Sequence, residues 1–162
     1  MSHFIMLADC LRKFNNWNGF LAVVTGLIQY PVSRLKLTWK SLQPSIIKKW
    51  ELVEKLASPM DNFKNLRELF DNTPPTILPI SIFLKDLIFV EENHNWYKNK
   101  ENETKLLNFH KVEILGKIIT RLNVCQNTPY LFPTNTTVQA FLHNMRYLEY
   151  HVLEEQSKQI ET

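Results

Sequence analysis

Two apolar segments flank a polar one in the stretch 77–122, which reads ILPISIFLKDLIFV, then EENHNWYKNKENETK, then LLNFHKVEILGKIITRL. The first segment, and the last from Phe109 onward, repeat apolar residues every three or four positions, which is the spacing of one helix face. The middle segment, 91–105, is too hydrophilic to pack. We therefore expect a helical hairpin over about residues 77–125, with a solvated tip, that projects from the rest of the molecule.

The same helical spacing continues on both sides of this stretch. It predicts a helix that is apolar on much of its circumference at 17–28, hence buried on several sides, and further helices at 4–14, 32–39, 44–56, 63–70, 138–145 and 148–153. Three Gly against eight Pro argue against an all-β fold, whose tight hairpins need glycine. We expect one all-α domain over residues 1–162, an irregular helical bundle with the projecting hairpin.

Charge and hydropathy exclude several classes of partner. The 19 Lys and Arg and 16 Asp and Glu are scattered, so a nucleic-acid partner is not expected. The longest nearly apolar runs, 20–28 and 77–84, are shorter than the ~20 residues of a membrane helix, so direct membrane insertion is not expected either. Cys10 and Cys125 form neither a metal pattern nor a disulfide framework, which favours a reducing compartment, the cytoplasm.

Motifs for covalent chemistry or a bound cofactor are also missing from the sequence. It contains no glycine-rich phosphate loop, no GxSxG and no HExxH. The five histidines do not pair with other ligands at metal-binding spacing, so we expect no metal and no cofactor. Cys125 ends a predicted helix, where the helix dipole raises the pKa of a thiol, and a core role fits it better than a nucleophilic one.

Several short blocks in a fixed order carry the most information. They are Asn15-Asn16-Trp17-Asn18-Gly19, Pro31-Val32-Ser33-Arg34-Leu35 with Thr38-Trp39, Asn62-Phe63-Lys64, Pro74-Pro75, Phe83-Leu84-Lys85-Asp86-Leu87 with Glu91-Glu92, Leu107-Asn108-Phe109, and Gln126-Asn127 with Pro129-Tyr130. In this order the blocks resemble the catalytic domain of guanine-nucleotide exchange factors for Ras-family GTPases (RasGEF). The resemblance covers nearly the whole chain but only about the carboxy-terminal two thirds of the family domain, so an amino-terminally truncated version is expected.

The resemblance implies a role for the hairpin. In this family the hairpin pries apart the two switch segments of the GTPase, and a hydrophobic residue with a Glu four positions later occupies the magnesium and phosphate region. The matching residues are Ile88 and Glu92, whose spacing places both on one helix face. A methyl-bearing side chain cannot ligate magnesium, and a carboxylate repels phosphate. Position alone favours a core Ile88 and a solvated Glu92; the resemblance points to the nucleotide site.

Leu21, Phe63 and Pro79 match positions that form an apolar pocket for an aromatic side chain of the GTPase in this family. Pro79 stands where the family has an aromatic residue, which weakens one pocket wall. Leu21 fits an ordinary core position equally well, because its helix is apolar on most sides.

Ile28, Ser33 and Lys85 are expected at the same interface. Ile28 replaces an Asn and Lys85 replaces a Thr of the family pattern, which alters the polar complementarity that governs partner choice. Three further matched residues are expected to hold loops and helix ends instead: Arg34, Asp86 and Asn108.

The resemblance therefore implies a guanine-nucleotide releasing factor in signal transduction that acts on a Ras-like small GTPase of the Ras, Rap or Ral type. Such a protein is not an enzyme, since it makes and breaks no covalent bond, and it reaches membranes through its GTPase. Two alternatives remain. One is an exchange-inactive helical module that binds a GTPase or another protein, and the other is a helical scaffold unrelated to GTPases.

Overall fold

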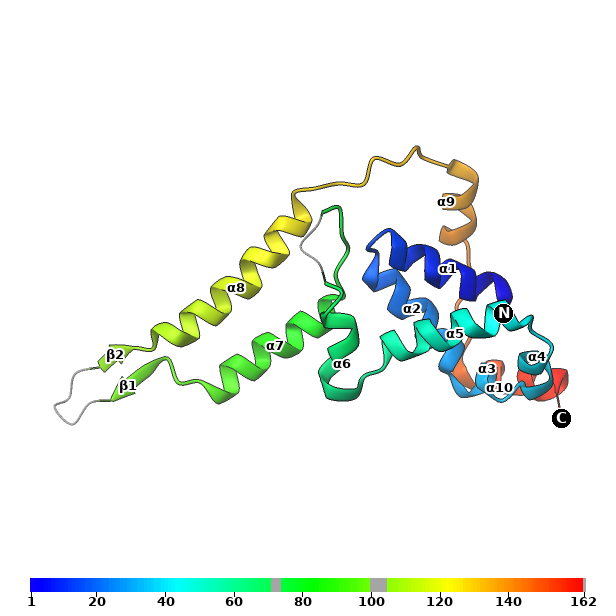
Figure 1. Ribbon diagram of the computed structural model, residues 1–162, viewed down its shortest axis with the longest axis horizontal. Helices are drawn as coiled ribbons and strands as arrows, with labels where there is room; N and C mark the ends of the chain where they lie inside the picture. Colours follow the sequence, from blue (N-terminus) through cyan, green and yellow to red (C-terminus); the bar gives the residue numbers. More distant parts are fainter. Residues whose placement is uncertain (71–73, 100–104, 162) are drawn as a thin grey trace.

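Ten helices and one short pair of strands form the described part of the computed structural model, residues 1–70, 74–99 and 105–161 (Figure 1). The predicted all-α class is confirmed. The helices are α1 (Ser2–Lys13), α2 (Trp17–Ile28), α3 (Tyr30–Ser33), α4 (Lys36–Lys40), α5 (Pro44–Ala57), α6 (Met60–Arg67), α7 (Ile80–Asn93), α8 (Phe109–Gln126), α9 (Thr136–His143) and α10 (Tyr150–Ile160). The strands are β1 (Tyr97–Asn99) and β2 (Lys105–Leu107).

The core lies where α1, α2 and α5 pack against one another and against the start of α7. Helix α2 contacts α1, α3 and α5, as its wide apolar circumference predicts. Removing these side chains from water supplies most of the favourable free energy of folding. The buried cluster consists of Ala8, Trp17, Phe20, Val24, Val53, Ala57, Leu66, Phe70, Leu78, Ile82 and Phe83.

The hairpin is attached to residues 1–70, here called the body of the molecule, at the amino terminus of α2. The Asn16 side chain accepts a hydrogen bond from the backbone N–H of Gly19 at 2.9 Å, and so caps the helix. A Cβ at Gly19 would lie 3.0 Å from that side chain, which explains the glycine. The backbone N–H of Trp17 donates to the carbonyl of Ile77, and the N–H of Ile77 donates to the carbonyl of Asn15. The first of the sequence blocks thus meets the segment that leads into α7.

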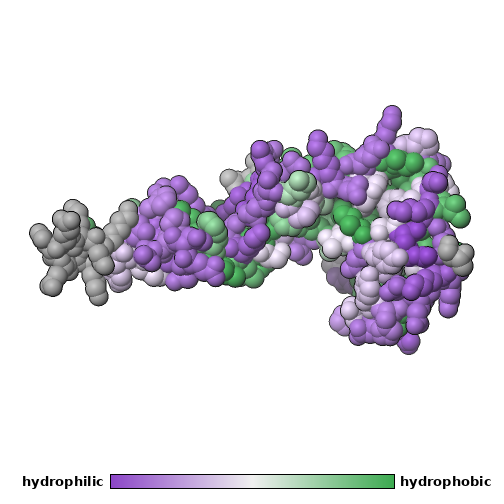
Figure 2. All heavy atoms as spheres, turned by 90° about the horizontal axis from the view of Figure 1, so that it is seen from below, coloured by the Kyte–Doolittle hydropathy of each residue, from purple (hydrophilic) through white to green (hydrophobic). Residues whose placement is uncertain are grey.

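Helices α7 and α8 pack together and extend from the body as a slender arm (Figures 1 and 2). The interpretation of 91–105 as a segment that does not pack is wrong in part. Strands β1 and β2 pair antiparallel, with Tyr97 opposite Leu107, so backbone hydrogen bonding extends the arm beyond its helices. Period-3.6 patterning gives no signal for a three-residue strand pair. Residues 100–104, the remainder of that predicted tip, lie outside the described residues.

Helix α10 packs against α3, and hydrogen bonds join its carboxy-terminal end to residues of α3, α4 and the turn between them. Arg34 donates to the backbone carbonyl of Ser157 at 2.7 Å, and the buried Ser157 hydroxyl donates to the carbonyl of Pro31. The Glu161 carboxylate accepts from the backbone N–H groups of Leu37 and Thr38 at 3.0 and 2.7 Å, which satisfies free donors in the first turn of α4.

The last helix, predicted at 148–153, runs from Tyr150 to Ile160, and two other predicted helices have a backbone path that the pattern does not show. The segment 32–39 forms two short helices, α3 and α4, because Leu35 leaves helical geometry with ψ of 68° and buries its side chain. The segment predicted as 63–70 is α6, in which Asp61, Asn62 and Phe63 have left-handed φ values of 51°, 58° and 59°. Helix patterning does not detect such a turn, since it depends on backbone angles that residues with a side chain rarely adopt.

Candidate functional site

The outward face of α7 is apolar, exposed and ends in a carboxylate. Ile80, Leu84 and Ile88 follow one another at intervals of four residues, and Glu92 continues the row. All four side chains are exposed, and Ile88 has 58% of its surface accessible. Residues four apart lie above one another on a helix. A core role for Ile88 is therefore excluded, and Ile88 and Glu92 share one solvent-facing surface of the arm.

The opposite face of α7 explains why this row points outward. Ile82, Phe83 and Val90 are buried there. Phe83 stacks on Phe70 of the body, with ring centroids 6.1 Å apart. Asp86 holds Arg67 of α6 with two charge-assisted hydrogen bonds of 2.7 and 2.8 Å. These contacts fix the rotation of α7 about its axis, and with it the direction of Ile88 and Glu92.

Two adjacent carboxylates at the end of α7 have different environments. Glu91 forms an ion pair with Lys111 of α8 at 2.7 Å and accepts a hydrogen bond from the Trp96 indole at 3.1 Å. The interaction with Lys111 is the main cause that lowers the pKa of Glu91. Within the described residues, the Glu92 side chain makes no hydrogen bond or ion pair. Glu91 thus holds the arm together, whereas Glu92 remains available to a partner.

Lys111 is the unexpected member of this cluster. Its side chain is 0% exposed, and its ammonium group lies 4.3 Å from the centroid of the Trp96 ring. Burial of an ammonium group is costly unless it is paired, so Glu91 and the aromatic face together stabilise it. Sequence reasoning missed this residue, because a Lys in an amphipathic helix is ordinarily placed on the solvated side. The only signal was a Trp in an otherwise polar segment.

Leu21, Phe63 and Pro79 do not form an open pocket in this structure. Leu21 and Phe63 are partly buried, and both pack against the core cluster. Pro79, which precedes α7, is less than 2% exposed, so a partner side chain could contact it only after the surrounding residues moved. The next residue, Ile80, is exposed and presents an apolar side chain at this end of α7.

The other three predicted interface residues lie on two separate parts of the molecule. Lys85 is exposed on α7, near the row described above. Ile28 is exposed at the end of α2, and the half-buried Ser33 ends α3, which Figure 1 shows on the body away from the arm. A partner that contacted all of them would have to span the arm and the body.

The three residues expected to be structural have structural contacts. Arg34 binds Ser157, and Asp86 binds Arg67. The buried Asn108 donates its side-chain amide to the carbonyl of Asn95 at 2.9 Å, which closes the arm just before α8. Half-buried Cys125 has a raised thiol pKa, mainly because burial disfavours the thiolate, as expected for a cysteine with a packing role.

The described residues hold no group of three or more His, Cys, Asp or Glu side chains placed to bind a metal ion. Among the helices described, none combines the length and the apolar character that crossing a membrane requires. The outward face of α7 presents the apolar row and the Glu92 carboxylate, while its inner face packs on the rest of the molecule. This arrangement suits contact with another macromolecule.

Comparison with known proteins gives a consistent result. Residues 1–113 match the RasGEF domain family. Three Dictyostelium discoideum proteins are similar to the chain. Ras guanine nucleotide exchange factor A is 31% identical over 99% of the chain, factor R is 34% identical over 86%, and factor M is 30% identical over 87%. The chain spans only 27%, 8% and 15% of the lengths of these relatives.

Proposed function

Because the chain belongs to the RasGEF family, we propose that it promotes GDP release from a Ras-like small GTPase by opening the switch regions with the α7–α8 hairpin. The observation that carries this proposal is the exposed Ile88 and Glu92 pair on the outward face of α7. Ile88 occupies the magnesium region with a side chain that cannot act as a ligand. Glu92 places a negative charge near the phosphates and weakens their binding.

The contact surface has two further parts in this proposal. Leu21 and Phe63, together with the buried Pro79, receive an aromatic side chain of the GTPase. Lys85 adds a positive charge to the arm, whereas Ile28 and Ser33 contact the GTPase from the body. Residues 1–162 act as one unit, since α10 joins the carboxy-terminal segment to α3 and α4.

The chemistry is a linkage effect and breaks no covalent bond. A domain that binds the nucleotide-free GTPase more tightly than the loaded form weakens nucleotide binding by the same factor. A thousandfold effect corresponds to roughly 4 kcal/mol of differential binding, which the interface must supply. No cofactor takes part. The activity belongs in the cytoplasm, at membranes that carry the GTPase.

The test is release of a fluorescent nucleotide from a panel of Ras, Rap and Ral proteins, with and without the chain. We expect faster release from at least one member, to a plateau rate as the concentration of the chain rises. Equal rates with and without the chain for every member would overturn the proposal.

A second candidate is a module that binds a GTPase without exchanging its nucleotide. The burial of Pro79 favours this candidate, because it leaves the apolar pocket closed on one side. Binding to nucleotide-free GTPase without accelerated release would distinguish it from the first.

A further inference from the structure

A cavity of about 770 Å³ lies where the arm meets the body, away from the outward row of α7. Its walls come from three helices, with Arg67 on α6, Phe83 and Asp86 on α7, and the segment 116–124 on α8. This volume lies within the range of small-molecule sites, and is larger than an inorganic ion requires. A ligand held there would touch the arm and the body at once.

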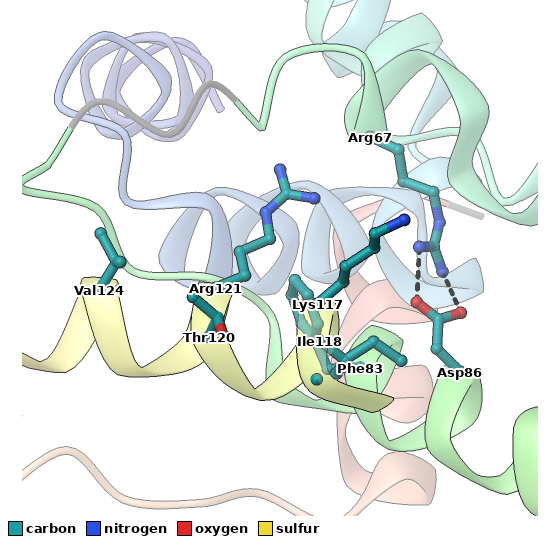
Figure 3. Close-up of a pocket in the computed structure, with 9 residues that line it drawn as sticks. Arg67, Phe83, Asp86, Lys117, Ile118, Thr120, Arg121 and Val124 are labelled. Carbon is teal, nitrogen blue, oxygen red and sulfur yellow. Dashed lines mark hydrogen bonds and ion pairs between the residues drawn. The ribbon is translucent and has the colours of Figure 1, made fainter. Parts of the chain in front are cut away.

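The described residues that line this cavity carry more positive than negative charge. Among the described lining residues, three cations, Arg67, Lys117 and Arg121, stand against a single carboxylate, Asp86. Asp86 is already engaged by both terminal nitrogens of Arg67. Figure 3 shows Lys117 and Arg121, four residues apart on α8, extending from one side of the helix into the space toward Arg67. The cavity therefore favours an anion.

Arg121 has hydrogen-bonding capacity left for such an anion. Its guanidinium donates from one terminal nitrogen to the carbonyl of Phe70, and the described residues accept none of its other N–H groups. The group also lies 5.4 and 5.8 Å from the ring centroids of Phe70 and Phe83, which hold its plane in place. Burial is the main cause that lowers the pKa of Arg121, and the charge of Arg67 lowers it further; a nearby anion would favour the charged guanidinium and so offset both.

Lys117 is the second donor. Its ammonium group pairs with Glu113 at 2.7 Å on the surface of α8, but 73% of the side chain is exposed. An exposed pair of this kind contributes little to stability and can exchange for a stronger partner. The rest of the lining is mostly apolar, with Phe83, Ile118 and Val124 beside Gly116 and the one hydroxyl of Thr120 among the described lining residues.

From these observations we propose that the cavity binds a small organic phosphate. Its phosphoryl oxygens accept hydrogen bonds from Arg121 and Lys117, since guanidinium and ammonium donors are the usual partners of phosphate in proteins. Its apolar part lies against Phe83 and Ile118. The bound ligand joins α6 to α8 and stiffens the base of the arm. This site is independent of the proposed nucleotide exchange.

The probe is phenyl phosphate, which carries a phosphoryl group and an apolar ring, titrated into the whole chain at constant ionic strength. We expect saturable binding to one site by calorimetry, tighter than that of inorganic phosphate, with amide NMR shifts concentrated at residues 116–124. Lys117→Gln should weaken binding about tenfold through the lost charge-assisted hydrogen bond. Lys48→Gln, which removes an exposed Lys on α5, should change nothing.

Two results would overturn the proposal. One is the absence of saturable binding in the millimolar range. The other is an equal loss of affinity in Lys117→Gln and Lys48→Gln, which would show that phenyl phosphate responds only to the overall charge of the protein. Since Lys117 is exposed and lies outside the core, its replacement tests the cavity without unfolding the chain.

Discussion

A single carboxylate, Asp9, ties two helices of the body together. Arg12, Lys13 and Lys49 place their charged groups 2.8, 2.9 and 3.1 Å from its oxygens, and the last of these comes from α5. Burial alone would raise the pKa of Asp9. The hydrogen bonds from Lys13, Arg12 and Lys49 outweigh burial and hold that pKa far below its usual range.

We expect Asp9→Asn to lower the free energy of unfolding at pH 7 by about 2 kcal/mol, less than for a fully buried pair because the three cations can still reach water. The folded-state pKa lies below the ordinary value of 3.8, so the stabilisation is complete above that value and is lost as the pH falls through the folded-state pKa. Denaturant unfolding of the variant and of the unmodified chain should therefore show a difference in the free energy of unfolding that narrows below pH 4. A constant difference would contradict this account.

Phe63 combines a half-buried ring with a left-handed backbone, with φ of 59°. We expect Phe63→Ala to weaken binding to nucleotide-free GTPase at least about tenfold, as for an interface anchor, and to cost at most about 1.5 kcal/mol of stability. Phe63→Gly removes the same ring and relieves the left-handed strain. It should match Phe63→Ala in affinity and be about 1 kcal/mol more stable.

Fluorescence binding titrations and thermal unfolding of the two variants give both quantities. If Phe63→Ala unfolds the domain, the ring is a core residue and its assignment to the interface fails.

At the scale of the element, α7 divides its tasks between two faces. The inner face supplies Phe83 to the core and Asp86 to the ion pair with Arg67. The outer face bears the exposed row that ends in Glu92. The helix ends at Asn93, where Glu91 is held by Lys111 of α8. A partner that pressed on the outer face would therefore meet a helix supported on its other side.

We expect Ile88→Ala with Glu92→Ala to slow GTPase nucleotide release about thirty- to a hundredfold, equivalent to about 2 to 3 kcal/mol in the barrier. Binding to nucleotide-free GTPase should fall much less, because the pair disfavours magnesium and phosphate more than it supplies contact. The melting temperature should barely change, since both side chains are exposed.

A matched control is Leu52→Ala with Glu51→Ala, an exposed apolar residue and an exposed Glu on α5. Nucleotide release should proceed at the unmodified rate with this control. If the Ile88 and Glu92 variant is as active as the control, the arm acts by steric opening alone.

At the scale of the whole molecule, long-range hydrogen bonds hold the carboxy-terminal helix α10 and Glu161 after it against residues 31–38. The contacts of Arg34 with Ser157 and of Thr38 with Glu161 each span 123 residues. By contrast, the side chains of α9 are exposed throughout. Helix α10 is held by these polar contacts and by the half-buried Val152 and Leu153, without a fully buried apolar side chain among its described residues. A region with few buried contacts opens at low free energy.

We expect Ser157→Ala to lower the free energy of unfolding of α10 by about 1 to 3 kcal/mol, because it leaves the buried carbonyl of Pro31 without its hydroxyl donor. Amide hydrogen exchange should accelerate in α10 while α2 and α5 keep their protection. The matched control is Gln159→Ala, which removes an exposed side chain from the same helix and should leave the exchange rates of α10 unchanged. Uniform acceleration across all helices in Ser157→Ala would show that α10 unfolds only with the whole domain.

The sequence by itself determined the helices and the arm. Apolar residues at intervals of three and four located α2, α5, α7 and α8 within a few residues of their observed bounds, because that interval follows from helix geometry alone. The same geometry placed Ile88 and Glu92 on one face. The ordered blocks, together with the match over residues 1–113, identified the family.

Only the tertiary structure decided which of these faces are covered. The structure buries Pro79, a position that no periodic pattern marks. It also pairs Glu91 with Lys111 and Ser157 with Arg34, which are distant from each other in the sequence. The physical reason is that local spacing states which residues share a face, whereas the choice of the element that packs on that face depends on the arrangement of all helices at once.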